Sequence, residues 1–158
     1  MSHHPSVDSQ ERIARRLILA GGVQGLGVRP AIARLAAECQ VTGSVANRRD
    51  GVEIVLEGLL HRVRQFQRLL PRSLPRGVSL EQIEESAQPV TGSTEFLIDA
   101  APADGPLRTL APRDLAVCET CLREVATPGN RRADYPLISC TDCGPRYTII
   151  EAMPYERS

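Results

Sequence analysis

The spacing of apolar residues predicts at least four strands in the first hundred residues. Residues 16–23 form an apolar run that is typical of a buried strand. Residues 52–58 alternate apolar with polar, as in a strand with one buried face. Further strands are predicted over residues 42–47, 78–86 and, as a short additional strand, 94–100. The Asp-Gly pair at the end of residues 48–51 predicts a turn between two of them.

Two other segments have helical periodicity. The first helix is predicted to begin with Pro30 at its first helical position, where a missing N–H costs nothing. Its apolar face consists of Ile32, Leu35, Ala36 and Cys39. The second helix is predicted over residues 59–70, and the proline-rich stretch 71–77 is expected to end it. Its apolar face consists of Leu59, Val63, Phe66 and Leu70.

The order of these elements, β-α-β-β-α-β with an extra short strand, predicts an α+β fold of the ferredoxin-like kind. In this fold an antiparallel sheet carries both helices on one face. Residues 1–12 are expected to form a disordered tail, and residues 13–101 the domain. A linker rich in Pro and Ala follows over 102–114, and residues 115–158 hold four of the five cysteines.

Composition narrows the possible functions. The 158 residues have zero formal net charge, so the composition indicates neither a nucleic-acid nor a membrane partner. Arginines on the second helix could form a basic patch, but no aromatic residues are interleaved for base stacking, which favours a solvated face. There is no lysine, which excludes lysine chemistry. No apolar run has membrane-spanning length and no export signal precedes the domain, so we expect a cytoplasmic protein.

The glycine-rich stretch GGVQGLGVRP, residues 21–30, lies between the first strand and the first helix. Gly22, Gly25 and Gly27 can adopt backbone angles that aim several N–H groups into one concavity. The helix N-terminus adds free N–H groups, and Arg29 adds a fork that suits phosphate or carboxylate. These features predict a phosphate cradle. A turn that is glycine-rich for steric reasons alone is the alternative, and the loop lacks the G-K-[ST] of a P-loop.

Asn47 ends the second predicted strand. In a right-handed β-α-β crossover the first two strands run parallel, so their carboxyl ends lie at one edge of the sheet. Asn47 and Arg29 should therefore meet there. An amide that orients a water beside a bound phosphoryl group suffices to hydrolyse an activated substrate such as an acyl phosphate, without a covalent intermediate. The alternative is a turn residue that bonds its own loop.

GGVQGLGVRP followed by GSVANRRDGVEIVLEG, residues 43–58, resembles the acylphosphatase signature, in which a V-Q-G-x-x-x-R loop precedes an Asn-containing turn. The resemblance covers about residues 15–100. It implies that Arg29 is the catalytic arginine and that Asn47 orients the water. It also implies that phosphate is bound by the loop residues Gln24, Gly25, Leu26, Gly27, Val28 and Arg29. The family usually has Phe where this chain has Val28.

Two C-x-x-C pairs, Cys118 with Cys121 and Cys140 with Cys143, are separated by 18 residues. This spacing is typical of a closed, structural zinc site. The surrounding module is too small for a core of its own, so the metal would supply most of its folding energy. Redox motifs or disulfides are the alternative. Cys39 is expected to be a buried core thiol.

The acylphosphatase-like segment followed by this cysteine module resembles the N-terminal part of the hydrogenase-maturation carbamoyltransferases, the HypF family. The proline after Arg29 is also typical of that family. The resemblance implies a substrate, carbamoyl phosphate, hydrolysed by this part, and a longer protein with a second finger and ATP-dependent transfer to a HypE-type partner. The chain would then be a fragment, unable to perform the ATP-dependent steps. A stand-alone acylphosphatase with a zinc module, or a non-catalytic zinc-stabilised interaction module, are the alternatives.

Overall fold

The computed structural model describes residues 10–100, 109–111 and 115–155. The expected tail and linker therefore lie largely outside the described residues. Five strands form one sheet: β1 (Arg12–Gly22), β2 (Thr42–Arg48), β3 (Gly51–Leu59), β4 (Ser79–Gln88) and β5 (Phe96–Asp99). The helices are α1 (Val28–Cys39), α2 (Leu60–Ser73), α3 (Glu119–Ala126) and a short 3-10 helix, η2 (Tyr147–Ile149). None of the helices described is long and apolar enough to cross a membrane.

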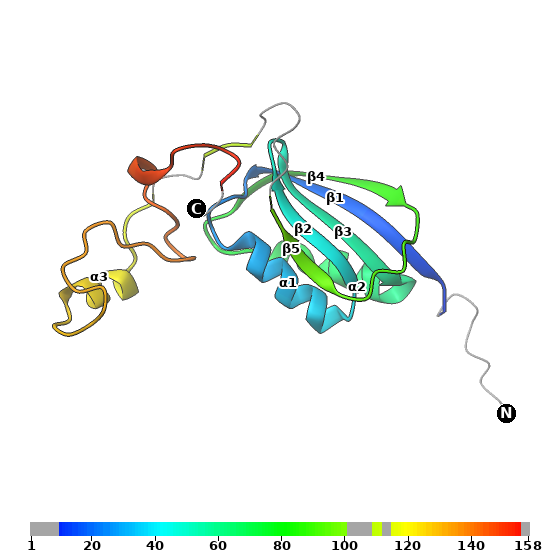
Figure 1. Ribbon diagram of the computed structural model, residues 1–158, viewed down its shortest axis with the longest axis horizontal. Helices are drawn as coiled ribbons and strands as arrows, with labels where there is room; N and C mark the ends of the chain where they lie inside the picture. The colour runs from blue at the N-terminus through cyan, green and yellow to red at the C-terminus, as the bar shows by residue number, and fades with distance from the viewer. Residues whose placement is uncertain (1–9, 101–108, 112–114, 156–158) are drawn as a thin grey trace.

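The strand order β4-β1-β3-β2-β5 contains the predicted ferredoxin-like arrangement and extends it by one strand (Figure 1). β3 pairs antiparallel with both β1 and β2, so β1 and β2 run parallel to each other with β3 between them. The ferredoxin-like fold is confirmed, but the additional strand makes the expected antiparallel sheet a mixed one, because β5 pairs in parallel with β2. The sheet is mixed because residues 89–95 carry the chain from the end of β4 to the start of β5 alongside β2.

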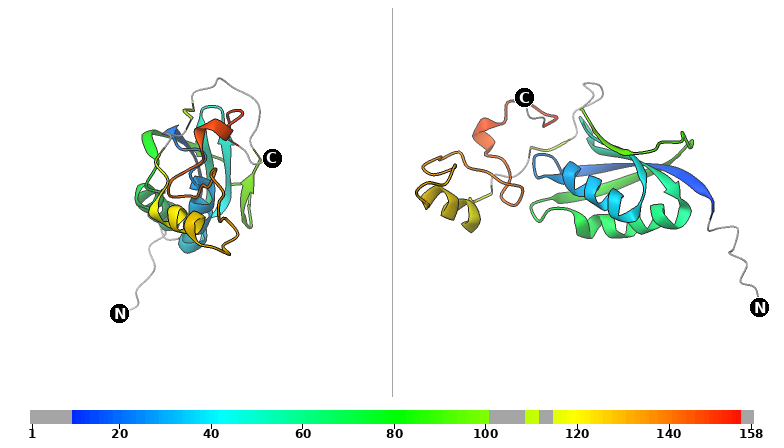
Figure 2. Two further views of the ribbon diagram at one scale, coloured as in Figure 1. Left: turned by 90° about the vertical axis from the view of Figure 1, so that its left-hand side faces the viewer. Right: turned by 60° about the horizontal axis from the view of Figure 1, so that its bottom comes forward.

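Both helices lie on the same face of the sheet, where their apolar stripes form the core (Figure 2). The four predicted apolar positions of α1 are all buried, including Cys39 at 3% exposure. Val63, Phe66 and Leu70 are the buried residues of α2. Each such side chain contributes roughly 1.5–3 kcal/mol by leaving water. The predicted core thiol at Cys39 is thus confirmed, and burial raises the pKa of this thiol, as does the nearby Glu38 carboxylate.

The structure corrects several predicted boundaries. β1 begins at Arg12, so the strand includes the last residue of the expected tail. α1 begins at Val28, which makes Pro30 its third residue; an N–H there would still have no partner within the helix. α2 runs through Pro71 to Ser73, because the buried Leu70 holds its last turn against the core. Leu59 belongs to β3 and not to α2.

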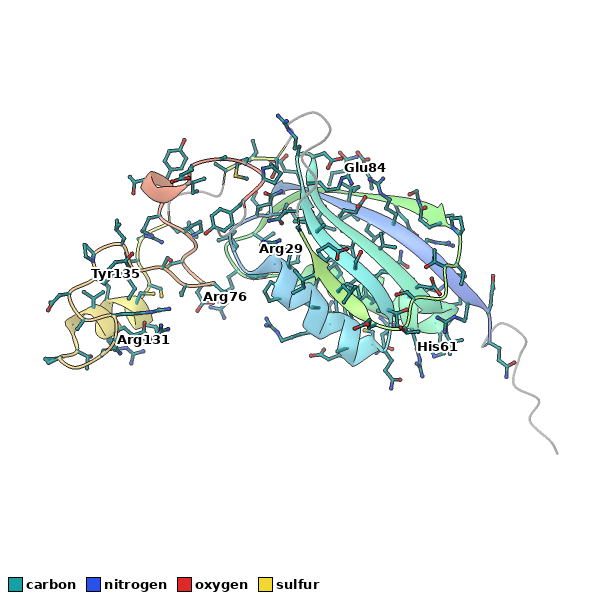
Figure 3. All side chains as sticks on the ribbon, viewed as in Figure 1. Arg29, His61, Arg76, Glu84, Arg131 and Tyr135 are labelled. Carbon is teal, nitrogen blue, oxygen red and sulfur yellow. The ribbon has the colours of Figure 1, made fainter. Side chains whose placement is uncertain are left out.

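The cysteine module lies beyond the end of the sheet domain, next to the loop that precedes α1 (Figures 1 and 2). Only three residues form the buried hydrophobic cluster within the described part of the module, Ile138, Cys121 and Cys143, and two of them belong to the cysteine cluster. In Figure 3, Arg29 lies where the sheet domain faces this module, whereas Arg131 and Tyr135 lie on the module itself.

Candidate active site and metal centre

The glycine-rich loop has the backbone of an anion cradle. Gly25 and Gly27 adopt φ angles of 76° and 73°, as predicted; Gly22 instead continues β1, and Gly21 has the positive φ, 114°. Within the described part of the chain, the N–H groups of residues 24–27 donate to no main-chain carbonyl. Gly27 is the N-cap of α1, and its carbonyl accepts the first helical hydrogen bond from Ala31 at 3.1 Å. A glycine cap supplies no side chain to the N–H groups of the first turn, which therefore face the loop.

Gln24 fixes the loop to the hairpin between β2 and β3. Its amide is 1% exposed, and Nε2 donates to the carbonyls of Arg48, at 2.7 Å, and Gly51, at 2.8 Å. Both protons of the amide nitrogen are therefore used, which leaves Oε1 as the acceptor. The contact brings the loop to the carboxyl end of β2, where Asn47 lies with 2% exposure. The predicted meeting of the loop and Asn47 at one sheet edge is present.

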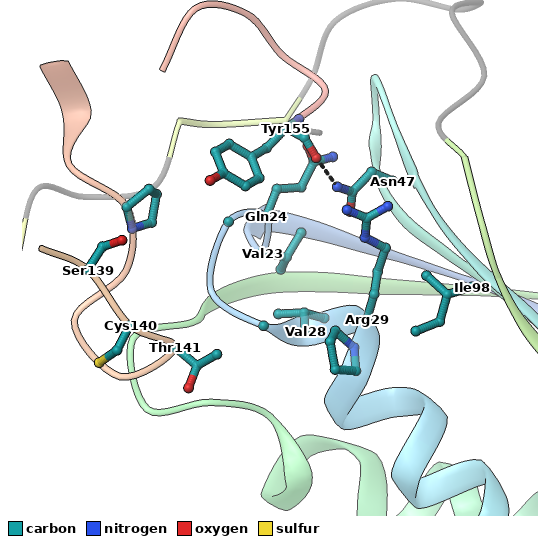
Figure 4. A pocket seen from close by; sticks show the side chains of 14 residues that line it. Val23, Gln24, Val28, Arg29, Asn47, Ile98, Ser139, Cys140, Thr141 and Tyr155 are labelled. Carbon is teal, nitrogen blue, oxygen red and sulfur yellow. Dashed lines mark hydrogen bonds between the residues drawn. The ribbon is translucent and has the colours of Figure 1, made fainter. Parts of the chain in front are cut away.

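A cavity of about 330 Å³ opens at this edge (Figure 4). Of the predicted phosphate-binding residues, all but Leu26 line it: Gln24, Gly25, Gly27, Val28 and Arg29. Asn47 lines it too, and in Figure 4 the Arg29 side chain extends from the start of α1 toward Asn47. Val28, which stands where Phe is usual, is 3% exposed and belongs to the core below the loop.

The far wall of the cavity comes from the cysteine module, a contact that the sequence analysis did not predict. Ser139, Cys140, Thr141, Pro145 and Tyr155 line this side. A Cβ placed on Gly27 would lie 2.6 Å from Thr141 Cγ2, so the module packs directly on the loop and requires glycine there. No sequence motif marks such a contact between segments more than a hundred residues apart.

Leu26 leaves the cavity and joins the two parts of the chain. It is 1% exposed, and its Cδ2 lies 2.6 Å from the position that a Cβ on Gly144 would take. Gly144 has a φ of 73°, a left-handed conformation that glycine adopts without steric cost. A side chain at position 144 would also clash, because Leu26 fills the volume that it would need.

The four cysteine sulfurs have the geometry of a metal centre. The Sγ atoms of Cys118, Cys121, Cys140 and Cys143 all lie within 4.8 Å of one another. Three of the separations are 3.7 Å (Cys118 to Cys140), 3.9 Å (Cys121 to Cys143) and 3.7 Å (Cys140 to Cys143). A tetrahedron with Zn–S bonds of about 2.3 Å has edges of about 3.8 Å. The sulfurs therefore fit zinc, and they are too far apart for disulfides, which need about 2.05 Å.

The surroundings of the cluster favour a cation. Burial raises the pKa of the Cys121 thiol, and the neighbouring thiols raise it further, so thiolates gather here only if a cation neutralises them. Burial would raise the pKa of the Cys143 thiol, but hydrogen bonds from main-chain N–H groups and from neighbouring thiols outweigh it and lower this pKa to about 7. Arg146 supports the second knuckle by donating to the carbonyls of Leu115 and Cys143, each at 2.8 Å.

One buried carboxylate lies away from the cavity, and the sequence reasoning assigned it no role. Glu57 in β3 is 1% exposed and accepts hydrogen bonds from Thr91 N at 2.7 Å, Thr91 Oγ1 at 3.0 Å and Gly92 N at 2.9 Å. Arg12 Nη2 lies 3.2 Å from it. Burial alone would raise the pKa of Glu57, but these donors outweigh it and lower the pKa to about 2. Glu57 therefore holds the loop that leads to β5.

Comparison with known proteins identifies both parts of the chain. Residues 15–98 match the acylphosphatase family, and residues 117–150 match the HypF finger. An acylphosphatase of Pseudomonas aeruginosa is 34% identical over 88 residues, which cover 55% of this chain and 96% of that protein. A carbamoyltransferase HypF of Synechocystis sp. is 40% identical over 137 residues, 87% of this chain and 18% of that protein. A crystal structure of full-length HypF in the phosphate- and nucleotide-bound form superposes with a TM-score of 0.81 at 34% identity, over 92% of this chain and 19% of that one.

The chain therefore belongs to the acylphosphatase family through its sheet domain, and that domain is joined to a four-cysteine zinc finger. The finger is of the HypF type, and the two parts together are similar in sequence and fold to the matched part of HypF carbamoyltransferases. The chain spans about a fifth of the length of the HypF relatives that it matches.

Proposed function

We propose that this region binds and hydrolyses an acyl phosphate, and that carbamoyl phosphate is its substrate within a carbamoyltransferase. The observation that carries the proposal is the cavity, where the N–H groups of the loop, Arg29 and Asn47 converge. The length of the HypF relatives supports the further proposal that ATP-dependent carbamoyl transfer to a HypE-type partner belongs to a longer protein.

In the proposed reaction the site accelerates hydrolysis by positioning the phosphoryl group and a water molecule and by stabilising the negative charge on the phosphoryl oxygens. The loop N–H groups of residues 24–29 and the Arg29 guanidinium bind the phosphoryl oxygens. Asn47 orients a water whose oxygen attacks phosphorus, while the bond from phosphorus to the carbamoyl oxygen breaks. The products are inorganic phosphate and carbamate; one proton of the water stays on the phosphate and the other is released to solvent. Carbamate is a good leaving group, so the reaction needs no general acid.

The zinc finger has a structural part in this proposal. Zinc bound by Cys118, Cys121, Cys140 and Cys143 would cross-link the two knuckles and hold Thr141 against Gly27. The domain boundaries that we propose, residues 13–101 and 115–158, place the cavity between the two units.

Release of phosphate from carbamoyl phosphate by the zinc-loaded chain tests the proposal. We expect Arg29→Ala and Asn47→Ala each to lower kcat/KM by about 10²-fold or more, since each removes a group that acts on the developing charge or the water. Arg34→Ala, on the exposed side of α1, is the matched control and should retain wild-type activity. Equal activity in all four proteins would refute the catalytic roles.

A further inference from the structure

Residues 150–155, which we call the strap, return from the finger to the acylphosphatase site (Figure 4). The last of them contacts both amides of the site through its main chain. Tyr155 N–H donates to Gln24 Oε1 at 2.7 Å, and Asn47 Nδ2 donates to the Tyr155 carbonyl oxygen. These two contacts span 131 and 108 positions of the sequence.

These hydrogen bonds fix the orientation of the Gln24 amide, then of the Tyr155 peptide and then of the Asn47 amide. Gln24 has both N–H protons committed to the carbonyls of Arg48 and Gly51, so its Oε1 must point toward the strap. An amide oxygen there requires a donor, which Tyr155 N–H provides. The peptide that follows then presents its carbonyl to Asn47. The main chain of this one residue thus supplies both the donor for Gln24 and the acceptor for Asn47.

This arrangement matters for Asn47 because an amide side chain has a broad, two-fold terminal torsion. An amide that flips exchanges its donor and its acceptor. With Nδ2 held by the Tyr155 carbonyl, Oδ1 keeps the opposite direction and remains the acceptor for a water proton. A nucleophilic water without a general base depends on such an acceptor for its orientation.

The finger holds the strap in place. Arg146 ties the second knuckle to Leu115, at 2.8 Å, four residues before the strap begins. Thr141 packs on Gly27 in the cradle itself, and Gly144 packs on Leu26. The strap is thus connected to a unit that is already seated on the loop.

We propose that the main chain of Tyr155 is a positioning group for Asn47, so that the strap following the finger completes the acylphosphatase site. The proposal rests on the proposed function. If the proposal is right, loss of the strap contact lowers kcat. A segment that merely covered the cavity would instead change substrate binding or inhibit the reaction.

Tyr155→Pro tests it, because proline removes the N–H that binds Gln24. Glu151→Pro is the matched control. It places a proline in the same strap, and Ile150 before it is already extended, with φ of −84° and ψ of 113°, as the residue before a proline prefers. We expect Tyr155→Pro to lower kcat for carbamoyl phosphate by about tenfold to 10²-fold. Inhibition by inorganic phosphate should change less than about threefold, and Glu151→Pro should match the wild type.

Unchanged or raised kcat in Tyr155→Pro would overturn the proposal, and a rise would identify the strap as inhibitory. An equal loss of kcat in Glu151→Pro would overturn it too, since the effect would then come from the strap's general shape. Zinc content and circular dichroism establish that both variants fold.

A second measurement does not depend on catalysis or on the variants. In wild-type protein, NMR should show slow hydrogen exchange of the Asn47 side-chain amide and a scalar coupling across its hydrogen bond to the Tyr155 carbonyl. A rapidly exchanging Asn47 amide would refute the contact. If the wild type released no phosphate, the proposed function would fail, while this measurement would still decide whether the strap fixes Asn47.

Discussion

Replacing Glu57 by Gln should destabilise the sheet domain strongly, although the side chain changes by one atom. The carboxylate accepts from the N–H and hydroxyl of Thr91, at 2.7 and 3.0 Å, and from the N–H of Gly92, at 2.9 Å. Glutamine keeps one acceptor oxygen and turns an NH₂ group toward these donors. Hydrogen bonds to a charged group contribute roughly 1.5–3 kcal/mol each. Loss of one or two of them predicts a decrease in the free energy of unfolding of about 3 kcal/mol.

The pKa of Glu57 gives a second route to the same magnitude. The donors lower it from its ordinary 4.5 to about 2 in the folded protein, which corresponds to about 3 kcal/mol. A carboxyl whose pKa is lowered by folding stabilises the protein fully above the unfolded value. That contribution is lost as the pH falls from about 4.5 through about 2.

Urea denaturation of wild type and Glu57→Gln between pH 7 and pH 2 measures this directly. We expect the free energy of unfolding of the wild type to exceed that of Glu57→Gln by about 3 kcal/mol at pH 7, and this difference to decrease as the pH falls below 4.5. Glu84→Gln, at an exposed position of β4, is the control and should change the free energy of unfolding by less than about 0.5 kcal/mol. If the two proteins were equally stable at neutral pH, or if the difference in their free energies of unfolding did not change with pH, the role assigned to the buried carboxylate would be refuted.

Three further predictions concern the finger and its junction with the glycine-rich loop. Leu26→Ala should lower the free energy of unfolding by roughly 2–5 kcal/mol in urea titrations, whereas Leu122→Ala at an exposed site should change little; similar values for both would contradict the packing. Gly144→Ala should lower zinc affinity in competition with a chromogenic chelator, because its φ is 73° and a Cβ would meet Leu26 at 2.6 Å; wild-type affinity would refute this. Removing zinc should expose the four finger thiols to a thiol reagent while Cys39 in the core reacts slowly, and metal analysis of native protein should give about one zinc per chain.

Much of the fold was predictable because the information is local. Helical spacing identified the buried faces of α1 and α2, since each face repeats with the period of its own helix. The handedness of the first crossover placed Asn47 beside the glycine-rich loop, and Cys spacing identified the metal centre. Boundaries were less accurate, as at Pro71, where the burial of Leu70 outweighs the preference of proline to end a helix.

The sequence by itself thus determined the position of the glycine-rich loop, the predicted water-orienting amide and the four-thiol cluster. Only the tertiary structure decided that the finger forms the second wall of the cavity and that Tyr155 joins Gln24 to Asn47. The physical reason is that these contacts use a main-chain N–H, a main-chain carbonyl and the empty space above glycines. Every residue except proline carries both main-chain groups, so no letter of the sequence marks the ones that meet.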